Sequence, residues 1–253
     1  MLKIYESIRL DFANLDKLAV FALIYAAFAL TCIYYLNNIK TVSELLQNTP
    51  LSFLGEAIGN TERSNLPQLA YWAVLLTIFY FLIPAAVIKI FFGKNLADFG
   101  LKIQIEEGFG QVLLLSFAVM LPLIFLASLT SSFAAKYPFL KIFDDAPYWS
   151  RTLLIWEIIY IYQFFCVEFF FRGFLIQSLK PTFGMYSIFM MTVPYCMIHF
   201  GKPGAEAFAA ILAGVFLGWL SYTNNTIWLG LTLHSVVALT MDFLALYQKK
   251  QLF

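Results

Sequence analysis

Residues 153–174 read LLIWEIIYIYQFFCVEFFFRGF, an apolar run that contains only three charged side chains. A bilayer core is about 30 Å thick and is crossed by roughly 20 apolar residues in a helix, so this run has the length of a membrane span. Such a span must be helical, because lipid offers no hydrogen-bond partner to an exposed backbone N–H or C=O. The stretch therefore predicts a transmembrane helix that carries ionisable groups.

The rest of the chain has the same character. Of its 253 residues, 61% are hydrophobic and 12% are charged, whereas soluble domains have about 45–50% apolar and roughly 25% charged residues. The other apolar runs are residues 18–36, 69–92, 112–130, 185–199, 207–222 and 227–247. We predict an all-α, polytopic transmembrane bundle of about seven to eight spans. The count is left open between seven and eight, because residues 4–18 and 133–143 are candidates to lie along the membrane interface.

Charge and cysteine content exclude several classes of protein. The formal net charge of +1 gives no field that would attract nucleic acid. Cys32, Cys166 and Cys196 lie in apolar runs, which is typical of small buried side chains rather than of a disulfide framework. Lys and Arg are divided almost evenly between the two sides, so the sequence predicts no membrane orientation. We predict one integral membrane domain, 1–253, with scaffold spans in 1–94 and a functional core in 95–247.

Ionisable residues at membrane depth concentrate in the C-terminal half of the chain. Each costs about 2.5–3.5 kcal/mol on insertion scales, so each is a candidate for function. The N-terminal spans contain almost none, and we expect them to act as scaffold. We expect function to lie in residues 150–245, where the candidates are Glu157, Glu168, Arg172, His199, Glu206, His234 and Asp242.

The quoted span carries a polar stripe. Glu168 and Arg172 are four residues apart, so they lie one helical turn from each other and can pair. Glu157 lies three turns earlier at nearly the same angle around the helix. Gly173 permits a close approach by a neighbouring helix. The alternative interpretation is a structural ion pair that only holds helices together.

The chain has two histidines, and both fall in or at the end of a predicted span. A single intramembrane histidine commonly makes no more than a hydrogen bond between helices. His199 and His234, together with Glu168, come from three different spans. Such a set supplies a carboxylate that can take a proton, and imidazoles that can position water or stabilise an oxyanion.

Other kinds of site fit the sequence poorly. It contains neither the H-E-x-x-H motif of zinc proteases nor a G-x-S-x-G nucleophile elbow. Cys166 and Cys196 lack a neighbouring cation that would form a thiolate, which favours a packing role. Glu168, His199 and His234 have the ligand types of a two-histidine, one-carboxylate metal site, but their spacing does not require one.

Three short motifs, in this order, resemble those of the CAAX prenyl protease and bacteriocin-processing family of intramembrane peptidases, also called the Abi family. The likeness covers roughly residues 95–245. The family's motifs are Glu-Glu-x-x-x-Arg, Phe-x-x-x-His and His-x-x-x-Asn or Asp. The corresponding residues here are Val167-Glu168-x-x-x-Arg172, Tyr195-x-x-x-His199 and His234-x-x-x-Ala238.

The resemblance implies a helical bundle with a polar cavity that opens within the membrane. In this family a glutamate and a histidine activate water against a peptide bond, while the later histidine and the Asn or Asp stabilise the oxyanion. Members are described as glutamic peptidases or as metallopeptidases. Their substrates range from prenylated C-terminal tails to peptide leaders, and some members confer self-immunity to bacteriocins.

The sequence departs from the family pattern at two positions. Val167 replaces the glutamate that the family uses as its base, and Ala238 replaces the Asn or Asp. A base contributes about 10²–10⁴-fold to the rate, and an oxyanion donor about 2.7–4 kcal/mol. Glu168 would have to take over as the base. Asp242, one helical turn beyond Ala238, is a candidate for the second role.

We therefore expect an intramembrane endopeptidase that cleaves a membrane-associated peptide or protein tail. In this prediction Glu168 and His199 activate water, His234 is the oxyanion partner, and Arg172 holds Glu168. The alternatives are a catalytically degenerate family member with a binding, immunity or regulatory role, and a proton-coupled carrier that uses these groups as a relay. No cofactor is predicted, and a divalent metal is left open. The predicted partners are membrane lipid and a peptide substrate, without nucleic acid, in a bacterial plasma membrane; the oligomeric state is not predicted.

Overall fold

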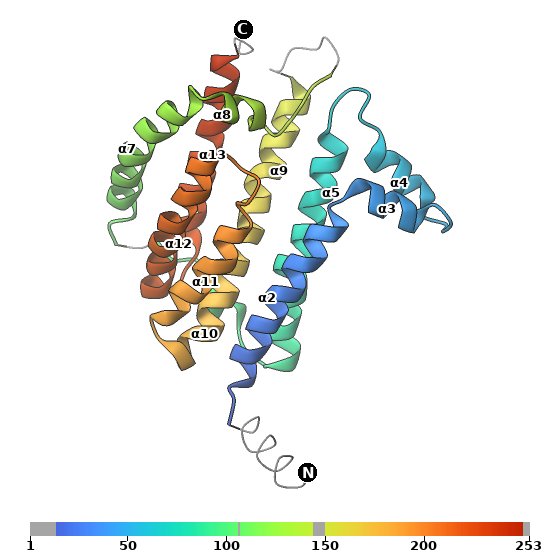
Figure 1. Ribbon diagram of the computed structural model, residues 1–253. Helices are drawn as coiled ribbons and strands as arrows, with labels where there is room; N and C mark the ends of the chain where they lie inside the picture. The colour runs from blue at the N-terminus through green and yellow to red at the C-terminus, as the bar shows by residue number, and fades with distance from the viewer. Residues whose placement is uncertain (1–13, 106, 144–149, 250–253) are drawn as a thin grey trace.

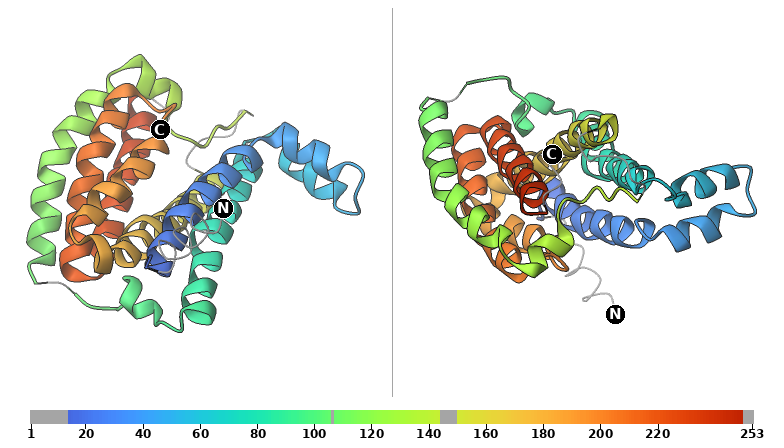
Figure 2. Two further views of the ribbon diagram at one scale, coloured as in Figure 1. Left: turned by 60° about the horizontal axis from the view of Figure 1, so that its bottom comes forward. Right: turned by 90° about the horizontal axis from the view of Figure 1, so that it is seen from above.

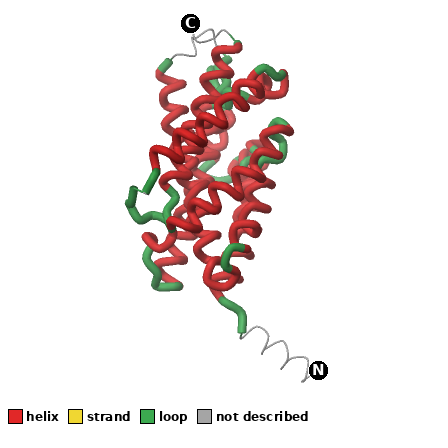
Figure 3. The backbone as a smooth tube through the Cα atoms, turned by 90° about the vertical axis from the view of Figure 1, so that its left-hand side faces the viewer, coloured by secondary structure: helices red, strands yellow, loops and turns green. Residues whose placement is uncertain are grey.

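The computed structural model describes residues 14–105, 107–143 and 150–249. In this part of the chain every regular element is a helix (Figures 1 and 3). The predicted interfacial segment at residues 4–18 falls mostly outside the described residues. The helices are α2 (Lys17–Leu36), α3 (Ile39–Leu46), α4 (Ser52–Gly59), α5 (Leu66–Leu76), α6 (Ile83–Ala86), α7 (Phe109–Ser128), α8 (Ser131–Lys136), α9 (Arg151–Glu168), α10 (Ile176–Phe183), α11 (Tyr186–Met197), α12 (Gly204–Asn224) and α13 (Trp228–Gln248).

Six of the described helices are long and apolar enough to cross a membrane. Two are composite, because π-helical turns join α5 to α6 and α9 to α10 without a break. The spans are Lys17–Leu36, Leu66–Phe91, Phe109–Ser128, Arg151–Phe183, Gly204–Asn224 and Trp228–Gln248. The predicted run 185–199 corresponds to the shorter helix α11. These findings confirm the all-α membrane bundle and roughly its number of spans.

The span Arg151–Phe183, which contains the quoted stretch, lies at the centre of the bundle. In its most apolar stretch of 18 residues, 56% of the residues are buried, whereas 6% are buried in the corresponding stretch of α7 at the outside. Figure 2 shows α7 beside α13 on one side of α9, and α2 and α5 on the other. The short helices α3 and α4 project from the bundle beyond α2 and α5 (Figures 1 and 2). The central span therefore contacts both halves of the molecule.

A π-helical segment, Phe169–Leu175, interrupts the central span directly after Glu168. Its phenylalanines have no exposed surface, and Phe170 stacks on Tyr80 with the ring centroids 4.3 Å apart. π-helical turns are rare and occur often at functional sites, because they change the direction of side chains within a continuous helix. This segment carries Arg172, so it sets where the guanidinium points.

Gly173 lies against the backbone that follows the 3₁₀ turn Leu96–Phe99. A Cβ atom at Gly173 would stand 2.4 Å from the carbonyl oxygen of Phe99. The next residue, Gly100, has φ +89°, and its carbonyl accepts a hydrogen bond from the N–H of Ile227 at 3.1 Å. The predicted close approach at Gly173 is thus observed, but the partner is a 3₁₀ turn rather than a membrane helix.

We expect the substitution Gly173→Ala to destabilise the protein, because the added methyl group meets a backbone atom that cannot rotate away. Overpacking of this kind costs about 1–3 kcal/mol. The matched control is Gly110→Ala in α7, where a Cβ atom has nothing within 4 Å and the helix gains about 0.5–1 kcal/mol. The measurement is the thermal unfolding midpoint in detergent, and equal midpoints for the two variants would contradict the expectation.

Close packing between α11 and α12 holds the motif Tyr195-x-x-x-His199 in place. A Cβ atom at Gly214 would lie 2.9 Å from Cγ2 of Thr192, and one at Gly218 would lie 2.9 Å from Cγ2 of Ile188. Small residues four apart let two membrane helices approach closely. Side chains of α11, which ends just before His199, therefore pack directly against the glycines of α12 and fix the two helices against each other.

Candidate active site

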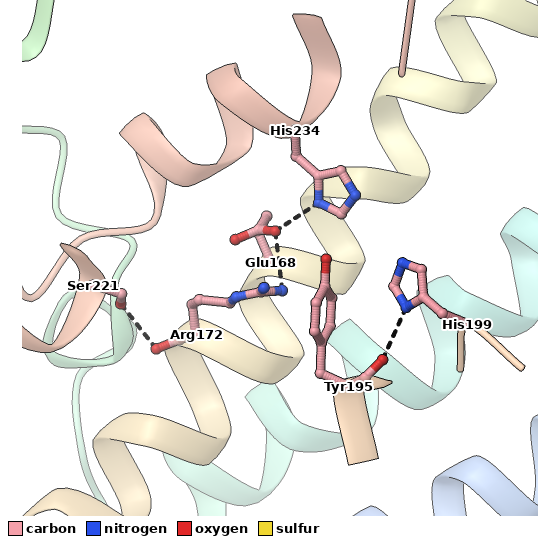
Figure 4. Close-up of polar contacts among 6 residues, drawn as sticks. All are labelled: Glu168, Arg172, Tyr195, His199, Ser221 and His234. Atoms are coloured by element: carbon pink, nitrogen blue, oxygen red, sulfur yellow. Dashed lines mark hydrogen bonds and ion pairs between the residues drawn. The ribbon is translucent and has the colours of Figure 1, made fainter. Parts of the chain in front are cut away.

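The carboxylate of Glu168 is the centre of a buried polar cluster (Figure 4). Its Oε1 accepts a hydrogen bond from Nδ1 of His234 at 2.8 Å and lies 3.1 Å from Nη1 of Arg172. The side chains of Glu168 and Arg172 have no exposed surface, and that of His234 is 15% exposed. The ion pair that the four-residue spacing predicts is therefore observed, and α13 adds the histidine.

The guanidinium of Arg172 also stacks on an aromatic ring. Its Cζ lies 3.8 Å from the centroid of the Tyr195 ring, within the range of a cation–π contact. The main-chain carbonyl of Arg172 accepts a hydrogen bond from the hydroxyl of Ser221 at 3.0 Å. Three helices thus hold this one residue, and its charge is offset by the Glu168 carboxylate on one side and by the ring on the other.

Gly230 makes room for the second carboxylate oxygen. Oε2 of Glu168 is buried without a hydrogen-bond partner and lies 3.0 Å from the position that a Cβ atom of Gly230 would occupy. Gly230 precedes His234 by one turn of α13. A larger residue would push the carboxylate away from its contact with the imidazole.

His199 joins this cluster through Tyr195. Its Nδ1 lies 3.0 Å from the main-chain carbonyl oxygen of Tyr195, and its ring centroid is 4.9 Å from that of the tyrosine. The ring of His234 is 6.4 Å from the same tyrosine. His199 is 6% exposed and Tyr195 is 2% exposed. The structure therefore brings Glu168, Arg172, His199 and His234 together around the ring of Tyr195.

These partners assign the tautomer of each neutral imidazole. A carbonyl oxygen only accepts, so Nδ1 of His199 carries the proton. The ion-paired carboxylate of Glu168 also accepts, so Nδ1 of His234 carries its proton as well. The Nε2 atom of each ring is left with a lone pair. In Figure 4 these second nitrogens lie on the sides of the rings that face each other.

An aromatic ladder on α9 supports His234 from the other side. Between ring centroids, Phe164 is 4.2 Å from the imidazole, Tyr160 is 4.8 Å from Phe164, and Trp156 is 4.6 Å from Tyr160. At the far end the indole N–H of Trp156 donates to Oδ2 of Asp242 at 3.0 Å. The ladder restricts the imidazole to the orientation that Glu168 requires.

The other predicted candidates lie outside the cluster. Asp242 is two turns of α13 beyond His234 and binds Trp156, and Glu157 is three turns of α9 before Glu168, with Oε2 buried and unpaired. Glu206 pairs with Lys202 at 2.7 Å and accepts from the hydroxyl of Tyr137 at 2.6 Å. Burial, and then the adjacent Glu206 carboxylate, raises the pKa of Tyr137 and keeps its phenol protonated as the donor.

The two positions that differ from the family motifs are both packed in apolar surroundings. Val167 is 5% exposed and belongs to the core cluster that includes Tyr25 and Phe170. Ala238 is 3% exposed and packs in the cluster of Trp156 and Phe164. Neither position directs a polar side chain toward the histidines.

The donor set does not fit a resident metal ion. Oε1 of Glu168 is already shared by an imidazole N–H and a guanidinium, and the fixed positive charge of Arg172 would repel a cation placed beside that carboxylate. Residues 14–105, 107–143 and 150–249 contain no group of three or more His, Cys, Asp or Glu side chains arranged to hold a metal. We derive no step through a metal ion.

Sequence reasoning missed the central position of Tyr195 and the role of Gly230. The signal for Tyr195 is its spacing of four residues before His199, which in a helix places a residue one turn away. Gly230 has the same spacing before His234. In both cases the spacing was visible, but the side chains that meet there come from other helices.

Comparison with known proteins finds one family that is similar to the segment containing the cluster. No curated protein matches the chain, and no solved structure does. Residues 149–240 match the family model of the type II CAAX prenyl endopeptidases, Rce1-like, and this segment contains Glu168, Arg172, Tyr195, His199 and His234. The chain is thus an integral membrane protein, and its residues 149–240 are similar to the type II CAAX prenyl endopeptidases, Rce1-like.

Proposed function

We propose that the protein is an intramembrane endopeptidase of the CAAX type, which cleaves a membrane-associated peptide or protein tail with a water molecule activated by its histidines. The observation that carries the proposal is the pair of Nε2 lone pairs in the cluster. One is fixed by Glu168 and the other by the carbonyl of Tyr195. Two acceptors that face each other can bind both O–H groups of one water molecule.

In this mechanism His234 is the general base. As the water oxygen attacks the peptide carbonyl carbon, one water proton moves to Nε2 of His234, and the carbonyl electron pair moves to the oxygen. The Glu168 carboxylate stabilises the resulting imidazolium, as carboxylates do beside catalytic histidines. When the C–N bond breaks, His234 returns the proton to the leaving amine. The second water proton stays on the new carboxyl group, so the products are a carboxylic acid and an amine, which ionise to a carboxylate and an ammonium group.

This division of roles differs from the one that the family resemblance implies. There the glutamate and the first histidine activate water, and the second histidine stabilises the oxyanion. Here Glu168 is fully buried and already bound to Arg172 and His234. The neutral His234 presents a lone pair rather than an N–H, which suits a base. His199 then orients the water as the second acceptor.

The proposed substrate is a peptide held at the membrane, because Glu168, Arg172 and His234 lie in helices that are long and apolar enough to span the bilayer. Lipid is the surrounding partner, and a bacterial plasma membrane is the proposed location. The family match supports a peptide tail as the substrate class.

The test is hydrolysis in H₂¹⁸O by the purified protein in liposomes that carry a lipid-anchored peptide. Attack by water predicts one ¹⁸O atom in the new C-terminal carboxylate, detected by mass spectrometry. The control liposomes carry the His199→Ala variant, in which the water loses one acceptor, and we expect cleavage to fall by about 10²-fold or more. Absence of product from the wild-type protein would overturn the proposal.

A second candidate is a binding protein without catalysis. It is favoured by the apolar packing of Val167 and Ala238, at the two positions where the family motifs carry polar groups. The same liposomes distinguish the two functions. Binding of the anchored peptide without release of product, unchanged in His199→Ala, would favour the second candidate.

A further inference from the structure

We infer that the hydroxyl group of Tyr195 is the hydrogen-bond donor that stabilises the oxyanion of the cleavage reaction. The inference rests on the proposed function and adds a catalytic residue to it. It follows from the donors and acceptors that the cluster presents, from the position of the tyrosine among them, and from the charge behind its ring.

The two histidines and the glutamate of the cluster present acceptors rather than free donors. The Nδ1 protons of both histidines are used by Glu168 and by a main-chain carbonyl, which leaves Nε2 of each as an acceptor. The carboxylate of Glu168 only accepts. Hydrolysis of a peptide places negative charge on the carbonyl oxygen, and this charge needs a donor within about 2.7–3.1 Å. A water molecule and two neutral imidazoles do not provide one.

Two groups in the cluster still have N–H or O–H protons to offer. Nε, Nη1 and Nη2 of Arg172 have no hydrogen-bond partner, but the guanidinium has no exposed surface, lies 3.1 Å from the Glu168 carboxylate and is covered by the tyrosine ring. The other group is the phenol of Tyr195. Ala238, one turn beyond His234, contributes no polar atom. The tyrosine hydroxyl is therefore the donor that can meet the substrate.

The position of Tyr195 suits this role. Its ring lies 4.9 Å from His199 and 6.4 Å from His234, nearly perpendicular to the latter. Figure 4 shows the hydroxyl at the end of the ring that points between the Glu168–His234 pair and His199. A carbonyl carbon attacked by water bound to the two histidines would have its oxygen near this hydroxyl.

The neighbouring residues hold the tyrosine ring in place and put a positive charge beside it. The Arg172 guanidinium covers one face of the ring at 3.8 Å, and Phe171 contacts it at 5.4 Å. A positive charge close to the phenol strengthens it as a donor and attracts the developing oxyanion in a site of low dielectric. A donor that is already in place costs no reorganisation when the charge appears.

In the reaction step the phenol does not lose its proton. As the water oxygen bonds to the carbonyl carbon, the π electron pair moves to the carbonyl oxygen, and the Tyr195 O–H donates to it. When the C–N bond breaks, the pair returns to the carbonyl and the hydrogen bond weakens. The proton that is transferred goes from water to His234 and then to the amine, as in the proposed mechanism.

The experiment is the substitution Tyr195→Phe in the same liposome assay. The aromatic ring and its contact with Arg172 remain, so we expect the thermal unfolding midpoint to stay within the error of the wild-type value. Loss of one oxyanion donor typically lowers kcat by about 10²–10³-fold. We expect this fall in kcat with KM within about twofold, because the hydrogen bond is made only in the transition state.

Tyr222→Phe is the matched control, since the Tyr222 ring also lies beneath a cation, Lys180, at 4.3 Å, but outside the cluster. We expect it to leave kcat unchanged. A second measurement is inhibition by a phosphinate analogue of the substrate peptide, which mimics the tetrahedral intermediate. Tyr195→Phe should weaken its binding by about the same factor as kcat.

The outcomes separate this inference from the proposed function. If wild type cleaves and Tyr195→Phe cleaves at the same kcat, the donor is another group and the inference is overturned, while the peptidase function stands. If Tyr195→Phe raises KM alone, the tyrosine only binds substrate and the inference is again overturned. If wild-type protein releases no product, the proposed function fails first and the inference fails with it.

Discussion

Replacing His234 with alanine is expected to lower kcat/KM for the membrane-anchored peptide by about 10²–10⁴-fold, because the variant loses its general base. The loss should exceed that of Tyr195→Phe, since the base takes part in both the attack and the departure of the amine. The measurement is the initial rate of product release from liposomes that contain equal amounts of folded protein.

The intermediate variant is Glu168→Gln, which keeps the size of the side chain and removes its charge. It should reduce the rate less than His234→Ala does, because the imidazole remains while the imidazolium loses its counter-ion. Thr240→Ala is the control on α13, since that hydroxyl donates only to the carbonyl of Val236 in its own helix, at 2.7 Å. Wild-type rates in His234→Ala would show that the histidine is not the base.

The substitution Arg172→Ala is expected to have the largest effect on stability. It removes the cation from a carboxylate that has no exposed surface. Breaking a buried pair from one side costs about 3–5 kcal/mol, because the remaining charge is left without compensation. We expect much less folded protein in membranes and a thermal midpoint many degrees lower. The contact between the guanidinium and Tyr195 is lost at the same time.

Two further variants distinguish this explanation from a general sensitivity to lost charge. Lys89→Ala removes an exposed cation from the π-helical segment Val87–Phe91, after α6, and should leave stability nearly unchanged. In the double variant Arg172→Ala with Glu168→Gln the stranded charge is gone, so it should be more stable than Arg172→Ala alone. Equal instability of the single and double variants would argue against a stranded carboxylate.

The sequence predicts the local part of this architecture well. Membrane spans depend on the length and polarity of continuous stretches, and residues 153–174 meet both conditions. The Glu168–Arg172 pair depends only on a spacing of four residues along one helix, so it was also predicted, and the structure contains it. Both are properties of a single segment.

The arrangement of the cluster could not be predicted in the same way, because it depends on how separate helices pack. His234 can bind Glu168 only because α13 lies beside α9 and Gly230 faces the carboxylate. The π-helical turn Phe169–Leu175 shifts the direction of the residues after Glu168, and apolar periodicity does not reveal it. Tyr195 was visible in the second motif, but its place between two histidines is a tertiary feature.

The pairing of Glu168 with a residue of its own helix has a consequence for biosynthesis. A span with isolated charges enters the bilayer at a cost of about 2.5–3.5 kcal/mol for each. Here the carboxylate and the guanidinium are one turn apart, so they neutralise each other as soon as the helix forms. The central span can therefore leave the insertion machinery before α11 and α13 have been synthesised, and the histidines arrive at a partner that is already in the membrane.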